Sequence, residues 1–123
     1  MKNLQEKLLQ RFEDYISFNT QSSEANIQAS PSTPNQLVLA KHLAEELKAL
    51  GLSDVSLDEH GYVMATLPAN CSEKGPVIGF ISHMDTAPDA PGGPVKPVLV
   101  KDYDGKDIVL NKEKNIIFST KDF

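Results

Sequence analysis

The sequence has few of the features that mark secreted, membrane or nucleic-acid-binding proteins. It contains one cysteine, Cys71, which excludes a disulfide framework and suits a reducing compartment. No apolar run approaches the length of a membrane span, and residues 1–7 lack the apolar core of a secretory signal. The net charge is −5 and no basic run occurs, which argues against nucleic acid as the main partner. We therefore expect a cytoplasmic protein with neither membrane nor nucleic-acid partners.

The length and composition fit one globular domain. The chain has 123 residues, enough for one domain and too few for two, and 40% of them are hydrophobic. Residues 3–18 fit an amphipathic helix because six apolar residues fall within an arc of about 140°. These six residues are Leu4, Leu8, Leu9, Phe12, Tyr15 and Ile16. The polar residues 19–32 that follow are predicted to form a loop.

A second helix is predicted between Pro34 and Gly51. Ser32 or Thr33 is a suitable N-cap, the proline suits the first turn, and the glycine suits the C-terminal stop. One face of this helix is apolar and is formed by Leu37, Leu39, Ala40, Leu43, Ala44, Leu47 and Leu50. His42 falls on the opposite, solvated face, so we interpret it as a surface histidine and not as a metal ligand.

A β-hairpin is predicted after the second helix. Residues 55–57 and 62–67 alternate in polarity or carry β-branched side chains, and His60-Gly61 between them suits a tight turn. We therefore interpret His60 as a turn residue. Cys71 lies in the following loop, without a histidine near it in sequence, and is expected to be an unreactive thiol.

The most informative stretch is residues 77–82, an apolar run that leads directly into His83-Met84-Asp85. Its β-branched residues and its flanking proline and glycine residues favour a strand that is buried on both faces, as in a parallel sheet covered by helices. The carboxyl end of such a strand is where ligands bind in open α/β sheets. We therefore predict an α/β fold, and we expect that part of the domain is missing because the chain offers few parallel neighbours for this strand.

The remaining residues are predicted to form a loop and short strands. Prolines recur in residues 88–97, which predicts a rigid surface loop or a polyproline II ligand. Residues 98–100 and 106–110 are predicted to pair through an Asp104-Gly105 turn, and residues 116–118 to form a last strand. The aspartates of this region lack the spacing and the closing glutamate of a calcium loop.

A histidine and an aspartate at a strand end suit one limb of a metal site. Imidazole is a good zinc ligand, and a carboxylate two residues away could bind its second nitrogen. His83 and Asp85 alone do not hold a zinc ion, because three or four ligands are needed. The alternative for this triplet is structural, with the histidine capping the strand and the aspartate binding nearby amides.

Residues 79–89 resemble the first metal motif of the M20 zinc peptidases, in their tripeptide aminopeptidase branch. The resemblance extends over essentially the whole chain, through residues 15–22, 31–36, 64–70 and 103–110. It implies a zinc-exopeptidase-like catalytic domain with a helix-covered mixed or parallel sheet, of which residues 1–123 are the N-terminal part. It also implies zinc-dependent removal of the N-terminal residue from tripeptides, and it leaves room for a homodimer of the full-length protein.

By this resemblance, His83 is a ligand of one of two zinc ions and Asp85 is the catalytic-site aspartate that supports it. The other metal ligands and the glutamate general base of the family, and its lid or dimerisation domain, would lie beyond Phe123. We therefore expect the 123 residues alone to be inactive. Two alternatives stay open: another M20 enzyme, such as a dipeptidase or deacylase, and a non-catalytic binding module that presents the proline-rich loop 88–97.

Overall fold

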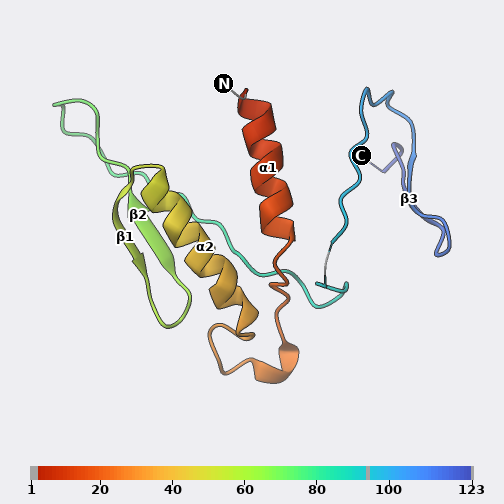
Figure 1. Ribbon diagram of the computed structural model, residues 1–123, viewed down its shortest axis with the longest axis horizontal. Helices are drawn as coiled ribbons and strands as arrows, with labels where there is room; N and C mark the ends of the chain where they lie inside the picture. The colour runs from red at the N-terminus through yellow and green to blue at the C-terminus, as the bar shows by residue number, and fades with distance from the viewer. Residues whose placement is uncertain (1–2, 94, 123) are drawn as a thin grey trace.

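The computed structural model describes residues 3–93 and 95–122. These residues form two α-helices, one short 3-10 helix and two separate antiparallel two-stranded sheets. In chain order the elements are α1 (Leu4–Ile16), η1 (Glu24–Asn26), α2 (Asn35–Ala49), β1 (Ser53–Leu57), β2 (Val63–Thr66), β3 (Ile108–Asn111) and β4 (Ile116–Phe118). Figure 1 shows the β1–β2 hairpin alongside α2, whereas β3 lies well away from it, on the far side of α1. No helix in the described part of the chain is long and apolar enough to cross a membrane.

The first helix forms as the sequence predicts, but much of its apolar face is uncovered. The Asn3 side chain caps the first turn by accepting a hydrogen bond of 2.9 Å from the Glu6 amide. No residue of α1 is buried, and Leu4, Leu8 and Phe12 are all more than half exposed. The local pattern therefore suffices to form the helix, although the described residues leave Leu4, Leu8 and Phe12 of this stripe open to solvent.

The small core lies where α2 packs on the β1–β2 hairpin. Leu39, Ala40 and Ala44 are the only apolar residues that are buried among those described, and all three belong to the predicted apolar face. Gly51 ends the helix with a φ of +83°, a conformation that glycine adopts without strain. The predicted N-cap is wrong: α2 is preceded by Pro34 and has no side-chain cap. The Thr33 hydroxyl instead donates a hydrogen bond of 2.8 Å to the Gln21 carbonyl.

The hairpin confirms the predicted turn at His60-Gly61. Leu57 pairs with Val63, and Gly61 has a φ of +86°. The Asp58 carboxylate accepts hydrogen bonds from the amides of His60 and Tyr62, at 3.0 and 2.9 Å. This closes the turn locally, which explains why it could be predicted from sequence.

The face of α2 that was predicted to be solvated in fact holds α1. Arg11 forms an ion pair with Glu46, and the Tyr15 hydroxyl donates a hydrogen bond to the same carboxylate. Burial, together with Glu46, raises the pKa of Tyr15 to about 12. His42 is exposed, as predicted, with its ring centroid 6.1 Å from that of Tyr15 and 5.2 Å from that of Phe18. Polar contacts therefore dock the first helix on the second.

The predicted strand over residues 77–82 is not part of any sheet. These residues pair with no described residue, and Val77, Phe80 and Ile81 are 98%, 95% and 100% exposed. A strand becomes regular only when neighbours accept its backbone hydrogen bonds and cover its side chains. The described residues provide neither, so the predicted helix-covered parallel sheet is absent. The observed class is two helices with two small antiparallel sheets.

The pairing of the last strands also differs from the prediction. Residues 98–100 form no strand, and the Asp104-Gly105 turn does not join a hairpin. Instead β3 pairs with β4, Ile108 opposite Phe118 and Val109 opposite Ile117. The short connection between β3 and β4 includes Asn115 in a left-handed conformation, with a φ of +50°. A closer local turn thus replaces the pairing with residues 98–100.

The chain exposes far more surface than a self-contained domain of its size. Its accessible surface is 10704 Å² for a mass of 13.5 kDa. A compact monomer of this mass exposes about 6,500 Å² by the scaling of area with mass. Much of the excess is apolar, because residues 77–81 and the apolar face of α1 are open to solvent. The fold therefore has large surfaces that need a partner to cover them.

Candidate active site

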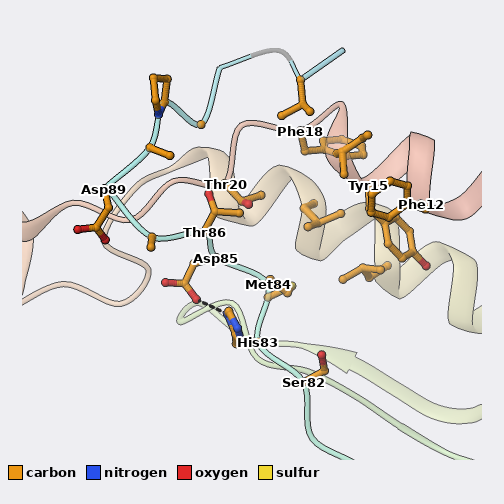
Figure 2. Close-up of a pocket in the computed structure, with 18 residues that line it drawn as sticks. Phe12, Tyr15, Phe18, Thr20, Ser82, His83, Met84, Asp85, Thr86 and Asp89 are labelled. Atoms are coloured by element: carbon orange, nitrogen blue, oxygen red, sulfur yellow. Dashed lines mark hydrogen bonds and ion pairs between the residues drawn. The ribbon is translucent and has the colours of Figure 1, made fainter. Parts of the chain in front are cut away.

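The two predicted site residues face each other. His83 Nδ1 lies 3.0 Å from Asp85 Oδ1 (Figure 2). A carboxylate can only accept a hydrogen bond, so this contact assigns a proton to Nδ1, and in the neutral imidazole the lone pair then lies on Nε2. The His83 side chain is 83% exposed and that of Asp85 is 43% exposed. The pair thus presents an oriented, accessible imidazole nitrogen, and the roles of both residues in catalysis stay predictions.

The histidines that were set aside at the sequence level lie elsewhere. His42 is on α2, beside the rings of Tyr15 and Phe18. His60 is in the hairpin turn, with Nδ1 3.4 Å from the Ser30 carbonyl oxygen. Cys71 is free and exposed. Neither histidine is grouped with His83, as was expected.

The pair lines a pocket of about 740 Å³ between the two helices and the segment that contains His83. Figure 2 shows Phe12, Tyr15 and Phe18 on one side of this pocket and His83 and Asp85 on the other. The residues that line the pocket are mostly apolar, and His83 and Asp85 provide polar groups at its edge. This combination is typical of sites that bind small molecules.

Two segments far apart in sequence meet beside the pair. Gln21 and Thr86 form an isolated parallel bridge. The Thr86 amide donates to the Thr20 carbonyl at 3.2 Å, and the Ser22 amide donates to the Thr86 carbonyl at 3.0 Å. Thr20 is buried. The residue that follows Asp85 is therefore fixed by the chain that leaves α1.

This contact could not be predicted from the sequence, in which residues 19–32 have only the pattern of a polar loop. A single parallel bridge leaves no hydrophobic period, and the hydroxyl and amide side chains that support it are also common in loops. The one signal was the family resemblance, which included Thr20, Gln21 and Ser22 without giving them a role.

The His83–Asp85 pair fits one ligand position of a zinc site and no more. A neutral imidazole with its second nitrogen bound to a carboxylate is a common zinc ligand. However, no group of three or more His, Cys, Asp or Glu side chains that could hold a metal occurs among the described residues. A complete site would need ligands from outside this part of the chain.

Comparison with known proteins gives one consistent result. No protein-family model matches the chain. Peptidase T of Clostridium novyi (strain NT) is 59% identical to it over 118 residues, which is 96% of this chain and 29% of that relative. The chain is homologous to peptidase T. Peptidase T of Clostridium acetobutylicum is 58% identical over 118 residues, and that of Geobacillus sp. (strain WCH70) is 52% identical over all 123 residues.

The match to peptidase T covers nearly all of this chain but less than a third of each relative. It covers 96–100% of the chain in these three cases, and in the Geobacillus relative it includes the segment with His83 and Asp85. The chain spans 29% of the length of each relative. The chain is therefore similar to a part of peptidase T.

Proposed function

We propose that the chain is the N-terminal part, residues 1–123, of the catalytic domain of a zinc-dependent tripeptide aminopeptidase. The observation that carries this proposal is an identity of 52–59% to peptidase T over nearly the whole chain. The open apolar surface supports it, because a catalytic domain would supply the partners that these residues lack. The peptidase T homology favours this activity over the dipeptidase or deacylase alternatives.

In this proposal His83 binds one zinc ion through Nε2, and Asp85 holds the ring by accepting a hydrogen bond from Nδ1. A carboxylate on the second nitrogen orients a ligating imidazole and strengthens its binding to a metal. When bound, the zinc would polarise the scissile carbonyl of the peptide. The remaining ligands and the general base would come from the rest of the protein.

In the complete domain we place residues 77–82 as an inner strand of a mixed or parallel sheet. The segment is apolar on both faces, as a strand covered by helices requires. His83 would then emerge at the carboxyl end of that strand, at the edge where ligands bind in α/β sheets. The free thiol of Cys71 suits a reducing compartment, and we propose a cytoplasmic location.

The test compares variants of the full-length protein in tripeptide hydrolysis and in zinc content. His83→Ala should lose bound zinc and activity, because it removes a ligand. Asp85→Ala should lose more activity than metal, because it disturbs a ligand that remains in place. His60→Ala is the matched control, since its exposed imidazole lies in the hairpin turn, and it should behave as wild type.

Two results would contradict the proposal. One is a His83→Ala variant that hydrolyses tripeptides like the wild type. The other is chelator-sensitive tripeptide hydrolysis by the purified 123-residue chain, since that chain should lack a complete metal site. The coding sequence after codon 123 gives an independent check, because an acidic stretch and a Glu-Glu pair are expected there.

A further inference from the structure

We propose that Gln21 is a positioning residue for the His83–Asp85 pair, which it sets by holding the loop of residues 86–92 that follows. The expected effect of Gln21 on catalysis rests on the proposed function. The contacts of Gln21 with the loop lie within the described residues and do not depend on that function. Gln21 lies in the segment that follows α1, about 60 residues away in sequence from the pair.

The side-chain amide of Gln21 binds the loop through both its nitrogen and its oxygen. Its Nε2 donates to the carbonyl oxygens of Pro88 and Ala90, at 3.1 and 2.9 Å. Its Oε1 accepts from the Gly92 amide at 3.3 Å. Only an amide of this length offers two donors and an acceptor together. A carboxylate in the same place would face two carbonyl oxygens without a proton to donate.

The backbone of Gln21 is itself fixed. Its amide donates to Asn19 Oδ1 at 3.2 Å, and its carbonyl accepts from the Thr33 hydroxyl at 2.8 Å. The bridge to Thr86 adds a contact next to Asp85. Gln21 therefore ties the loop to Thr33, in the segment that leads into α2.

The loop approaches Gln21 so closely that glycine is needed at position 92. A Cβ atom added there would lie 2.6 Å from Gln21 Cβ and 2.7 Å from Asn19 Oδ1. Such distances are below van der Waals contact, so a side chain would push the loop away. The contact is thus built by shape as well as by hydrogen bonds.

The consequence for the pair follows from the order of the chain. Asp85 lies between its bond to His83 and the anchored Thr86, so the position of its carboxylate depends on where the loop is held. Releasing the loop should let Asp85 move away from Nδ1. The imidazole would then lose the hydrogen bond that fixes its tautomer.

The first experiment measures the pair without using activity. Imidazole ¹⁵N chemical shifts of His83, which distinguish the two tautomers, are recorded in the zinc-free full-length protein. We expect the Nδ1–H tautomer in the wild type and a shift toward the Nε2–H tautomer in Gln21→Ala and Gln21→Glu. Gln28→Ala, which truncates an exposed glutamine of the same region, should leave the spectrum unchanged. An unchanged His83 spectrum in Gln21→Ala would overturn the inference, whatever the activity.

The second experiment measures hydrolysis of a tripeptide by the same variants. Gln21→Ala should lower kcat by about 10–100-fold with little change in KM, the effect expected for a residue that supports a metal ligand. Gln21→Glu should be at least as damaging. In an Asp85→Asn background, Gln21→Ala should add little, because both changes act on one unit.

The outcomes separate this inference from the proposed function. Full additivity with Asp85→Asn would overturn the positioning role, since the two residues would then act independently. If the wild-type protein hydrolyses no tripeptide, the proposed function fails. In that case a changed His83 spectrum in Gln21→Ala would still support the positioning of the pair.

Discussion

The two halves of the described chain differ in how much of their structure they can hold by themselves. Residues 3–66 contain both α-helices, the β1–β2 hairpin and every buried residue in the described part of the chain. Residues 67–122 contain one short hairpin, long extended segments and no buried residue among those described. Figure 1 shows this contrast between α2 with its hairpin and the open path of the later residues.

The difference lies in how far away the stabilising partners are. A helix or a tight hairpin forms its hydrogen bonds within a few residues, so α2 and β1–β2 form next to each other. An inner strand depends on neighbours that are distant in sequence and on helices that cover it. Residues 77–82 have the composition of an inner strand and no such neighbours. The segment that carries His83 is therefore the part most dependent on the rest of the protein.

The largest effect is expected at Phe80, in the segment that depends most on the rest of the protein. Phe80→Ala should cost about 3–5 kcal/mol of unfolding free energy in the full-length protein, where the ring would be buried. In the 123-residue chain the same change should cost almost nothing, because Phe80 is 95% exposed. Chemical unfolding followed by circular dichroism in both proteins checks this difference.

Leu39→Ala is the matched control for that comparison. Leu39 is buried by residues of this chain, so its truncation should cost about 2–5 kcal/mol in either protein. Equal costs of Phe80→Ala in the two proteins would break the contrast between the halves.

A smaller effect is expected where the two halves touch. Gly92→Ala would place a methyl group 2.6 Å from Gln21 Cβ, so we expect a loss of about 1–3 kcal/mol in the full-length protein. Gly93→Ala is the control, since a Cβ there would meet nothing within 4 Å. Thermal unfolding of both variants measures the difference. If both variants matched the wild type, the loop would not be held against Gln21.

The smallest effect concerns the docking of α1 on α2. Tyr15→Phe removes the hydrogen bond to Glu46 and should cost about 1 kcal/mol. The pKa of Tyr15 is raised from 10.0 to about 12, so its contribution is complete below pH 10 and is lost as the pH rises through 12. Unfolding free energies of wild type and Tyr15→Phe should therefore converge over that pH range. Tyr62→Phe, at an exposed tyrosine, should leave the wild-type dependence intact.

The sequence predicted the structural features that depend on residues close to one another in sequence. It indicated both helices, the turn at His60-Gly61 and the proximity of His83 to Asp85, because each follows from spacing or from a local turn. It missed the roles of the Glu46 and Gln21 side chains, whose hydrogen-bond partners lie 31 to 71 residues away in sequence. It also predicted a sheet around residues 77–82 that the described residues do not form. The composition of this segment indicates the environment that it requires and not the one that it has here.

Hydrogen exchange of the backbone amides of residues 77–82 tests the central claim most directly. It is measured in the 123-residue chain and in the full-length protein under the same conditions. We predict rapid exchange in the chain alone, where these amides have no partner among the described residues, and strong protection in the full-length protein, where neighbouring strands would bind them. Rapid exchange in both proteins, or strong protection in the chain alone, would contradict the account.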